Sequence, residues 1–190
     1  APEPGPYLCR LKIVQCDVDI DLRSIRTTGG DFNQADLEEI ITPLIETLAN
    51  AVRQEVSDRS TLIFTQDVGS AQAMATALQS IGIRADWVSG DSRDRAEKLA
   101  KYQDRRSQVL CSCALLTEGF DAPHTAAIVL CRPTKSRPLY AQMIGRGTRL
   151  SPGKLDCAVI DFNYITSKLD LVKPVDLFDT THTDSDEIGR

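Results

Sequence analysis

Residues 61–89, "TLIFTQDVGSAQAMATALQSIGIRADWVS", read as a strand, a helix and a second strand. "TLIF" at 61–64 is a short apolar run that is typical of a buried strand. In 70–82, Ala73, Ala77, Leu78 and Ile81 recur on one helical face, and Gly82 is a typical helix stop. "IRADWVS" at 83–89 is the next strand. This order predicts one unit of a parallel α/β sheet.

The same alternation continues toward the C-terminus. "RDRAEKLAKYQ" is predicted to be a helix that Asp91 or Ser92 caps, and a further helix is expected around 136–147. Three more strands are predicted, at 107–113, 126–132 and 156–162. Their nearly continuous apolar runs are typical of strands that are buried on both faces. The fold class is therefore α/β, with three layers: a mainly parallel sheet and helices on both faces.

Four regions are predicted along the chain. Residues 1–10 are proline-rich and polar, like a linker. Residues 11–60 hold an edge strand or connecting segment, a turn at "GGDF" and an amphipathic helix interrupted by Pro43, and they lead into the domain. The domain itself covers 61–165, and a polar, acidic tail covers 166–190.

Composition limits the class of protein. The chain has 190 residues, is 42% hydrophobic and carries a formal net charge of −5, which allows one core and a local basic site but not a wholly basic surface. It has no apolar run of 18 residues, so no membrane span is expected. A zinc site is not expected, because no CxxC pair occurs and only two histidines are present. The six cysteines are expected to be buried and reduced, which suits the cytoplasm.

The chain lacks a phosphate-binding P-loop, G-x-x-x-x-G-K-[ST]. The nearest match, "GTRLSPGK" at 147–154, is one residue too long and has Leu155 in place of the hydroxyl. "DLEEI" at 36–40 resembles an acidic metal-binding box, but a solvated helix face explains it better, since no apolar strand precedes it. We therefore expect no metal site here, and no residues that hold Mg²⁺ with the β- and γ-phosphates.

Basic residues gather between Asp121 and Asp156, where no acidic residue occurs. They are Arg132, Lys135, Arg137, Arg146, Arg149 and Lys154. If the helix at 136–147 continues for one more turn, Gln142, Arg146 and Arg149 share a face about 60° wide. Two guanidinium groups on one γ-phosphate would stabilise the charge that develops in phosphoryl transfer, as arginine fingers do. The alternative is a helix with solvated arginines on its surface.

"LLTEGFDAP" at 115–123 follows a predicted strand, as a ligand-binding loop would. Gly119 permits a tight turn. Asp121 could accept a hydrogen bond from a ribose hydroxyl or hold an arginine in place; the alternative is a turn with an Asx cap. His124, in the same loop, is expected to be structural or solvated rather than catalytic.

Taken together, these motifs resemble the C-terminal, second RecA-like domain of a superfamily 2 DEAD/DEAH-type helicase, in the DNA-repair and type III restriction-subunit branch. "TLIFTQDV" resembles motif IV, "VLCSCALLTEGFDAP" motif V and "YAQMIGRGTRL" motif VI. "WVSGDSRDRAEKLAKYQ" resembles the strand and helix that follow motif IV. The match runs from about residue 61 to residue 162, in the family's order.

The resemblance implies a role for each matched position. Arg146 and Arg149 would be arginine fingers for ATP bound with Mg²⁺ on a separate first RecA-like domain, and Gln142 would contact the γ-phosphate or couple it to the domain interface. Gly119 and Asp121 would line the nucleotide. The positions that would touch the nucleic-acid backbone are Thr65, Ser89, Gly90, Cys113 and Thr117.

Two positions depart from the family pattern. Cys113 stands where many relatives have a threonine, and a thiol is a poor donor to phosphate. Met143 stands where some relatives have an arginine. The implied function is the second motor domain of an ATP-dependent helicase or translocase, with DNA favoured over RNA by the branch alone. The alternatives are a non-catalytic RecA-like scaffold and a nucleotide- or sugar-binding domain.

Overall fold

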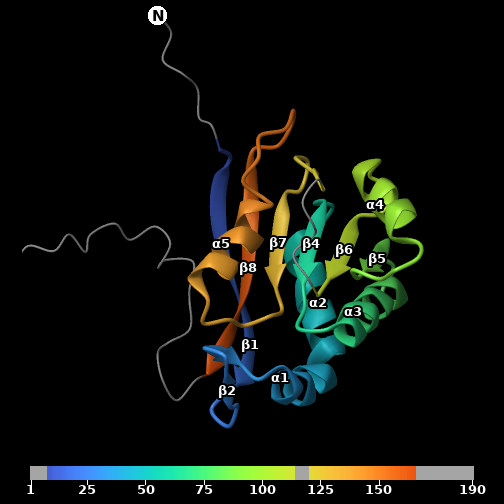
Figure 1. The fold of residues 1–190 in the computed structure, drawn as a ribbon. Coiled ribbons are helices and arrows are strands. Elements are labelled where there is room, and N and C mark those ends of the chain that lie inside the picture. The colour runs from blue at the N-terminus through green and yellow to red at the C-terminus, as the bar shows by residue number, and fades with distance from the viewer. Residues whose placement is uncertain (1–7, 114–119, 166–190) are drawn as a thin grey trace, which may run out of the picture.

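The computed structural model describes residues 8–113 and 120–165. Six strands form one sheet in the order β1-β8-β7-β4-β6-β5 (Figure 1). In that order their bounds are Arg10–Asp21, Asp156–Ile165, Ala127–Leu130, Thr61–Phe64, Val109–Ser112 and Ala85–Val88. Neighbouring strands all pair in parallel. The predicted α/β fold with a parallel sheet is confirmed.

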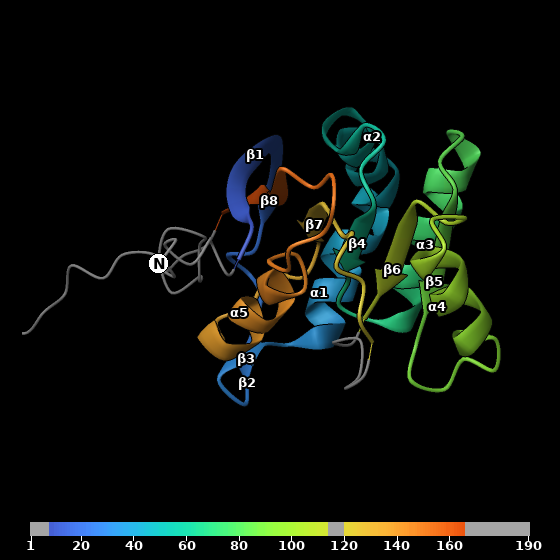
Figure 2. The same cartoon turned by 90° about the horizontal axis from the view of Figure 1, so that it is seen from above.

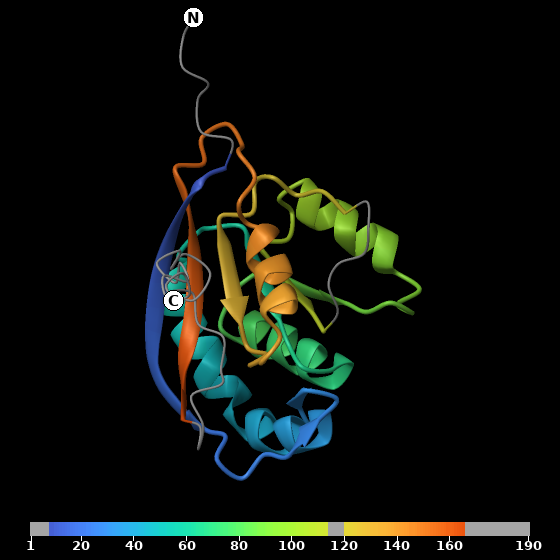
Figure 3. The same ribbon diagram turned by 60° about the vertical axis from the view of Figure 1, so that its left-hand side comes forward.

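The central strands are buried because they consist almost entirely of apolar residues. Every residue of β4, β6 and β7 is buried, as their continuous apolar runs predict. β1 lies at the edge of the sheet beside β8 (Figure 3), and most of its side chains are at least partly exposed. Of the two alternatives for this segment, edge strand or connector, the structure shows the edge strand.

Helices cover both faces of the sheet. Three helices pack on one face: α1 (Gln34–Ile41), α2 (Ile45–Val56) and α3 (Val68–Ser80). The other face carries α4 (Arg95–Gln103) and α5 (Arg137–Gly145), and Figure 2 shows α2 and α5 on opposite sides of the strands. Ile63 belongs to the first hydrophobic core and Leu62 and Phe64 to the second, because side chains alternate along β4.

The segment before residue 61 is part of the same core. Ile20 of β1 and Leu48 and Val52 of α2 are fully buried among residues of the central strands. The helix interruption predicted at Pro43 appears as a short 3₁₀ turn, η1 (Thr42–Leu44), between α1 and α2. Proline removes a backbone donor there and ends the regular α-helical bonding.

Two short strands around "GGDF" were not predicted. β2 (Thr27–Thr28) and β3 (Asp31–Phe32) pair antiparallel around Gly29 and Gly30, whose φ angles are +61° and +86°. Positive φ is readily adopted only by glycine, so the turn itself was readable from the sequence. The strands are too short to leave a periodic signal.

The predicted cap of α4 is wrong. The helix begins after Asp94, and neither Asp91 nor Ser92 caps it. Ser92 is used in the turn before the helix, where its hydroxyl accepts a hydrogen bond from the Ser89 amide at 2.9 Å. Its carbonyl accepts from the Arg95 amide at 3.1 Å. The turn therefore delays the start of the helix.

The N-terminal cap of α3 can be tested by mutation. Asp67 accepts hydrogen bonds from the Ser70 amide at 2.8 Å and the Ser70 hydroxyl at 2.6 Å. Asp67→Ala is expected to cost about 1 kcal/mol of stability, as loss of a helix cap does. Thermal unfolding of the chain should then shift down by about 2–4 °C. Asp94→Ala is the matched control, because the Asp94 carboxylate makes no cap bond and pairs with Lys98 of the same helix, at 2.9 Å. An equal shift for both variants would contradict the role of Asp67.

Candidate functional site

The segment after α5 does not continue the helix as predicted. α5 ends at Gly145, and the amides of Arg146, Gly147 and Thr148 each donate to the carbonyl three residues earlier, at 3.3, 2.8 and 3.4 Å. The predicted common face of Gln142, Arg146 and Arg149 is therefore wrong for Arg149. Gln142 and Arg146 remain one turn apart, since Arg146 keeps helical dihedral angles of −64° and −26°.

Arg149 has an acidic partner from outside the basic segment. Its guanidinium donates to the Asp121 carboxylate, and the two side chains are 46% and 62% exposed. Holding an arginine was one of the alternatives for Asp121. An ion pair this exposed contributes only about 0–1 kcal/mol, so Arg149 can exchange this partner for another anion at low cost.

Gly147 lies directly against the sheet. A Cβ atom at this position would be 2.4 Å from Sγ of Cys157 and 2.8 Å from Cγ1 of Ile128. At Gly145 the same atom would have nothing within 4 Å. The close neighbours of Gly147 are therefore side chains of β7 and β8, whereas Gly145 leaves room for another group.

The backbone that carries Arg149 is fixed by several hydrogen bonds. The Lys154 ammonium donates to the carbonyls of Gly147 at 2.7 Å and Arg149 at 2.8 Å. The Cys9 amide donates to the Thr148 carbonyl at 2.8 Å, and the Cys9 thiol to the Gly147 carbonyl at 3.2 Å. A fixed backbone thus carries an exposed guanidinium group, as a preorganised anion site requires.

Gln142 and Arg146 complete the predicted group. Gln142 is exposed on α5 and Arg146 is half-buried at its C-terminal cap. Within the part of the chain that the structure describes, neither side chain makes a hydrogen bond or ion pair. Both are therefore available to a partner outside these residues.

The predicted nucleic-acid contacts lie at the opposite end of the strands. Thr65, Ser89 and Cys113 follow β4, β5 and β6 directly, so they meet at the carboxyl edge of the parallel sheet. Gly90 is exposed there, with open space where a Cβ would stand. Thr117 lies outside the described residues, and so does Gly119 of the predicted nucleotide contacts.

Two of these side chains have internal partners. Thr65 is 1% exposed and its hydroxyl donates to the Asp67 carbonyl at 3.1 Å. The Ser89 and Ser92 hydroxyls are 2.9 Å apart, in hydrogen-bond contact. A ligand at this edge would meet the Thr65 hydroxyl only after that bond had opened.

Cys113 is half-buried, and burial raises the pKa of its thiol. The thiol therefore stays protonated near neutral pH. Its carbonyl accepts a long hydrogen bond of 3.4 Å from Arg132, which brings a cation to the same edge.

His124 packs inside the loop that holds Asp121. Its Nε2 lies 3.0 Å from the Tyr102 carbonyl, and the two rings are 5.2 Å apart. Burial lowers the pKa of the imidazole, which therefore stays neutral at pH 7. These contacts agree with the structural role expected from the sequence.

The comparisons with known proteins bear on this arrangement. The family model "Helicase conserved C-terminal domain" matches residues 39–151, more than half of the chain. The chain belongs to the helicase C-terminal domain family. The matched range includes Arg146, Arg149, Asp121 and the carboxyl-edge residues.

A relative of known sequence supports this assignment. The Saccharomyces cerevisiae protein "Putative ATP-dependent helicase IRC3" is 37% identical over 164 residues, which cover 82% of this chain and 24% of that protein. This chain thus spans about a quarter of the length of that relative.

Two solved structures share the fold. A fragment described as "a putative HsdR subunit of a type I restriction enzyme" from Vibrio vulnificus has a TM-score of 0.63 at 21% identity, covering 83% of this chain and 32% of that one. The E. coli DEAD-box protein SrmB has a TM-score of 0.56 at 16% identity, covering 84% and 79%. The predicted helicase C-terminal domain is confirmed by the family match, and these two structures show the same RecA-like fold.

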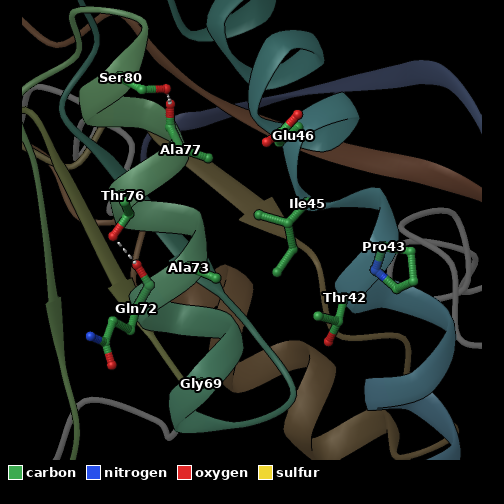
Figure 4. A pocket seen from close by; sticks show the side chains of 10 residues that line it. All are labelled: Thr42, Pro43, Ile45, Glu46, Gly69, Gln72, Ala73, Thr76, Ala77 and Ser80. Atoms are coloured by element: carbon green, nitrogen blue, oxygen red, sulfur yellow. Dashed lines mark hydrogen bonds between the residues drawn. The ribbon is translucent and has the colours of Figure 1, made fainter.

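A groove of about 600 Å³ lies on the other face of the sheet, between α3 and the η1–α2 segment (Figure 4). Small residues such as Gly69, Ala73 and Ala77 line it on α3. The Thr76 and Ser80 hydroxyls donate to carbonyls of their own helix. None of the predicted site residues lines this groove.

The described residues contain neither a metal-binding cluster nor a helix that could span a membrane. Within 8–113 and 120–165, no three His, Cys, Asp or Glu side chains are placed to hold a metal ion. In the same residues, no helix is both long enough and apolar enough to cross a membrane.

Sequence reasoning missed Lys154 and Cys9 as parts of the site. In the sequence, Lys154 is one of several basic residues and Cys9 lies in the predicted linker. Both residues bond to backbone carbonyls of other loops. Such contacts cannot be predicted from residue type or spacing, because every residue has a carbonyl.

Proposed function

We propose that this helicase C-terminal domain is the second motor domain of an ATP-dependent helicase or translocase. Arg146 and Arg149 act as arginine fingers on a nucleotide held by a first RecA-like domain of the same polypeptide. The observation that carries the proposal is the exposed guanidinium of Arg149 on a fixed backbone, beside the half-buried Arg146.

The residues present fit one side of an ATP site. Two arginines suit the charge of a γ-phosphate. Asp121 pairs with Arg149, and its carboxylate could accept a hydrogen bond from a ribose hydroxyl when Arg149 binds the phosphate instead. Bound ATP with Mg²⁺ would supply the phosphoryl group and the metal charge. Because the chain has no P-loop, the first domain would hold both. Gln142 would link the phosphate to the domain interface.

The carboxyl edge of the sheet would carry the nucleic-acid strand. Ser89, Gly90 and Cys113 lie there together with Arg132. The contact at Cys113 would be made by its backbone amide, since the thiol is a poor donor. DNA is favoured over RNA by the branch resemblance. The free cysteines among the described residues suit a reducing compartment, and we propose the cytoplasm.

ATPase and DNA-binding assays distinguish the proposed motor domain from a non-catalytic scaffold and from a stand-alone nucleotide-binding domain. The isolated chain is expected to hydrolyse no ATP and to bind single-stranded DNA only weakly, because it holds one side of each site. The complete polypeptide is expected to hydrolyse ATP in a DNA-dependent way. Steady-state assays of both forms provide the test.

Robust ATP hydrolysis by the isolated chain would contradict the claim that a separate first domain holds the phosphates. A complete polypeptide without a P-loop, or without turnover, would favour the scaffold. ADP bound tightly by the isolated chain would favour the nucleotide-binding domain.

A further inference from the structure

Lys154 joins two loops that the proposed function places at the nucleotide. Its Nζ donates to the Gly147 carbonyl at 2.7 Å, the Arg149 carbonyl at 2.8 Å and the Pro123 carbonyl at 3.2 Å. An ammonium group has three donors, and here all three are used on main-chain oxygens. The loop that holds Asp121 and the turn that holds Arg149 are therefore tied together through one side chain.

We propose that Lys154 is a positioning residue for Arg149. The inference rests on the proposed arginine-finger function and deepens it. Lys154 fixes the backbone at Arg149 itself, while the Asp121 carboxylate contacts the guanidinium at the other end of the same side chain. When Arg149 leaves Asp121 for a phosphate, the backbone bonds of Lys154 remain and keep the guanidinium within reach.

The chemistry of the contact favours lysine over arginine. The three acceptors come from separate peptide groups, which an ammonium with rotatable donors can satisfy at once. A planar guanidinium directs its donors in a fixed fork that suits a single carboxylate or phosphate. Lys154→Arg should thus keep the charge and restore only part of the geometry.

A misplaced finger should slow the chemical step more than it weakens binding. A shift of about 1 Å in a catalytic group can cost about 100-fold in rate. For Lys154→Met in the complete polypeptide we expect kcat for ATP to fall by about ten- to a hundredfold, with little change in KM. Lys154→Arg should recover part of the loss. Lys101→Met is the matched control, because Lys101 pairs with Glu97 on the exposed surface of α4.

A second measurement does not depend on activity. Hydrogen exchange in the isolated chain should be faster at the amides of 147–149 in Lys154→Met, and unchanged there in Lys101→Met. The amides of β4 report whether the variant is folded, since this strand is wholly buried. If Lys154→Met unfolds the chain, Lys154→Arg should still show faster exchange confined to 147–149.

The outcomes separate the inference from the function on which it rests. Exchange at 147–149 that matches wild type in folded Lys154 variants overturns the inference. So does wild-type kcat for Lys154→Met in an active polypeptide. A wild-type polypeptide without ATP turnover removes the proposed function and with it the catalytic part of the inference. Exchange then decides whether Lys154 holds the turn.

Discussion

Arg149→Ala is expected to lower ATP turnover by the complete polypeptide about a thousandfold, at the lower end of the effect of arginine fingers. The reason is that Arg149 presents a charged, planar guanidinium from a backbone that Lys154 fixes, and alanine removes that group. ATP binding should change little, since the P-loop domain would hold most of the nucleotide. Single-turnover kinetics and nucleotide titration measure the two quantities separately.

The control for this variant is Arg53→Ala. Arg53 is an exposed arginine in the last turn of α2, on the face of the sheet opposite α5. Its removal changes net charge equally and should leave turnover unchanged. Equal turnover in wild type and Arg149→Ala would remove Arg149 from the finger role, and a parallel loss in Arg53→Ala would point to a general charge effect.

Gly147→Ala is expected to destabilise the isolated chain by about 1–3 kcal/mol, the usual cost of overpacking a core. The added Cβ would meet Sγ of Cys157 at 2.4 Å and Cγ1 of Ile128 at 2.8 Å. Neither neighbour moves easily, because both residues are fully buried. At about 2–4 °C per kcal/mol for a chain of this size, thermal unfolding should detect the loss.

Gly145→Ala is the matched control, two residues away in the same motif. An added Cβ there meets nothing within 4 Å, and Gly145 closes α5. Alanine favours helix over glycine by roughly 0.5–1 kcal/mol, so stability should hold or rise slightly. If both variants unfold at the same temperature, the close packing of Gly147 against β7 and β8 does not explain why glycine is needed at position 147.

The local elements were predictable because their signals are local. Apolar runs identified β4, β6 and β7, and helical spacing identified α3. The strand order was not predictable from periodicity, since the pairing of β1 with β8 joins the two ends of the domain. The hairpin of β2 and β3 is too short for periodicity to mark its strands.

In the candidate site, too, residue types were predictable and long-range contacts were not. The charge pattern and the resemblance both singled out Arg149. Holding an arginine was one alternative for Asp121, but the sequence did not show which arginine, because Asp121 lies 28 positions before Arg149. The common face of Gln142, Arg146 and Arg149 depended on one more helical turn after α5, whereas Gly147 packs against side chains of β7 and β8. The burial of Thr65 was also missed, since the residue type alone does not show which way a strand end faces.

The most direct test is a structure of the complete polypeptide with single-stranded DNA and an ATP analogue that mimics the γ-phosphate. Arg149 should have left Asp121, with its guanidinium about 3 Å from an oxygen of the γ-phosphate mimic, a normal hydrogen-bond distance. Arg146 should reach the same group. Arg149 still paired with Asp121, with neither arginine contacting the nucleotide in the closed state, would contradict the central claim that this domain supplies the arginine fingers.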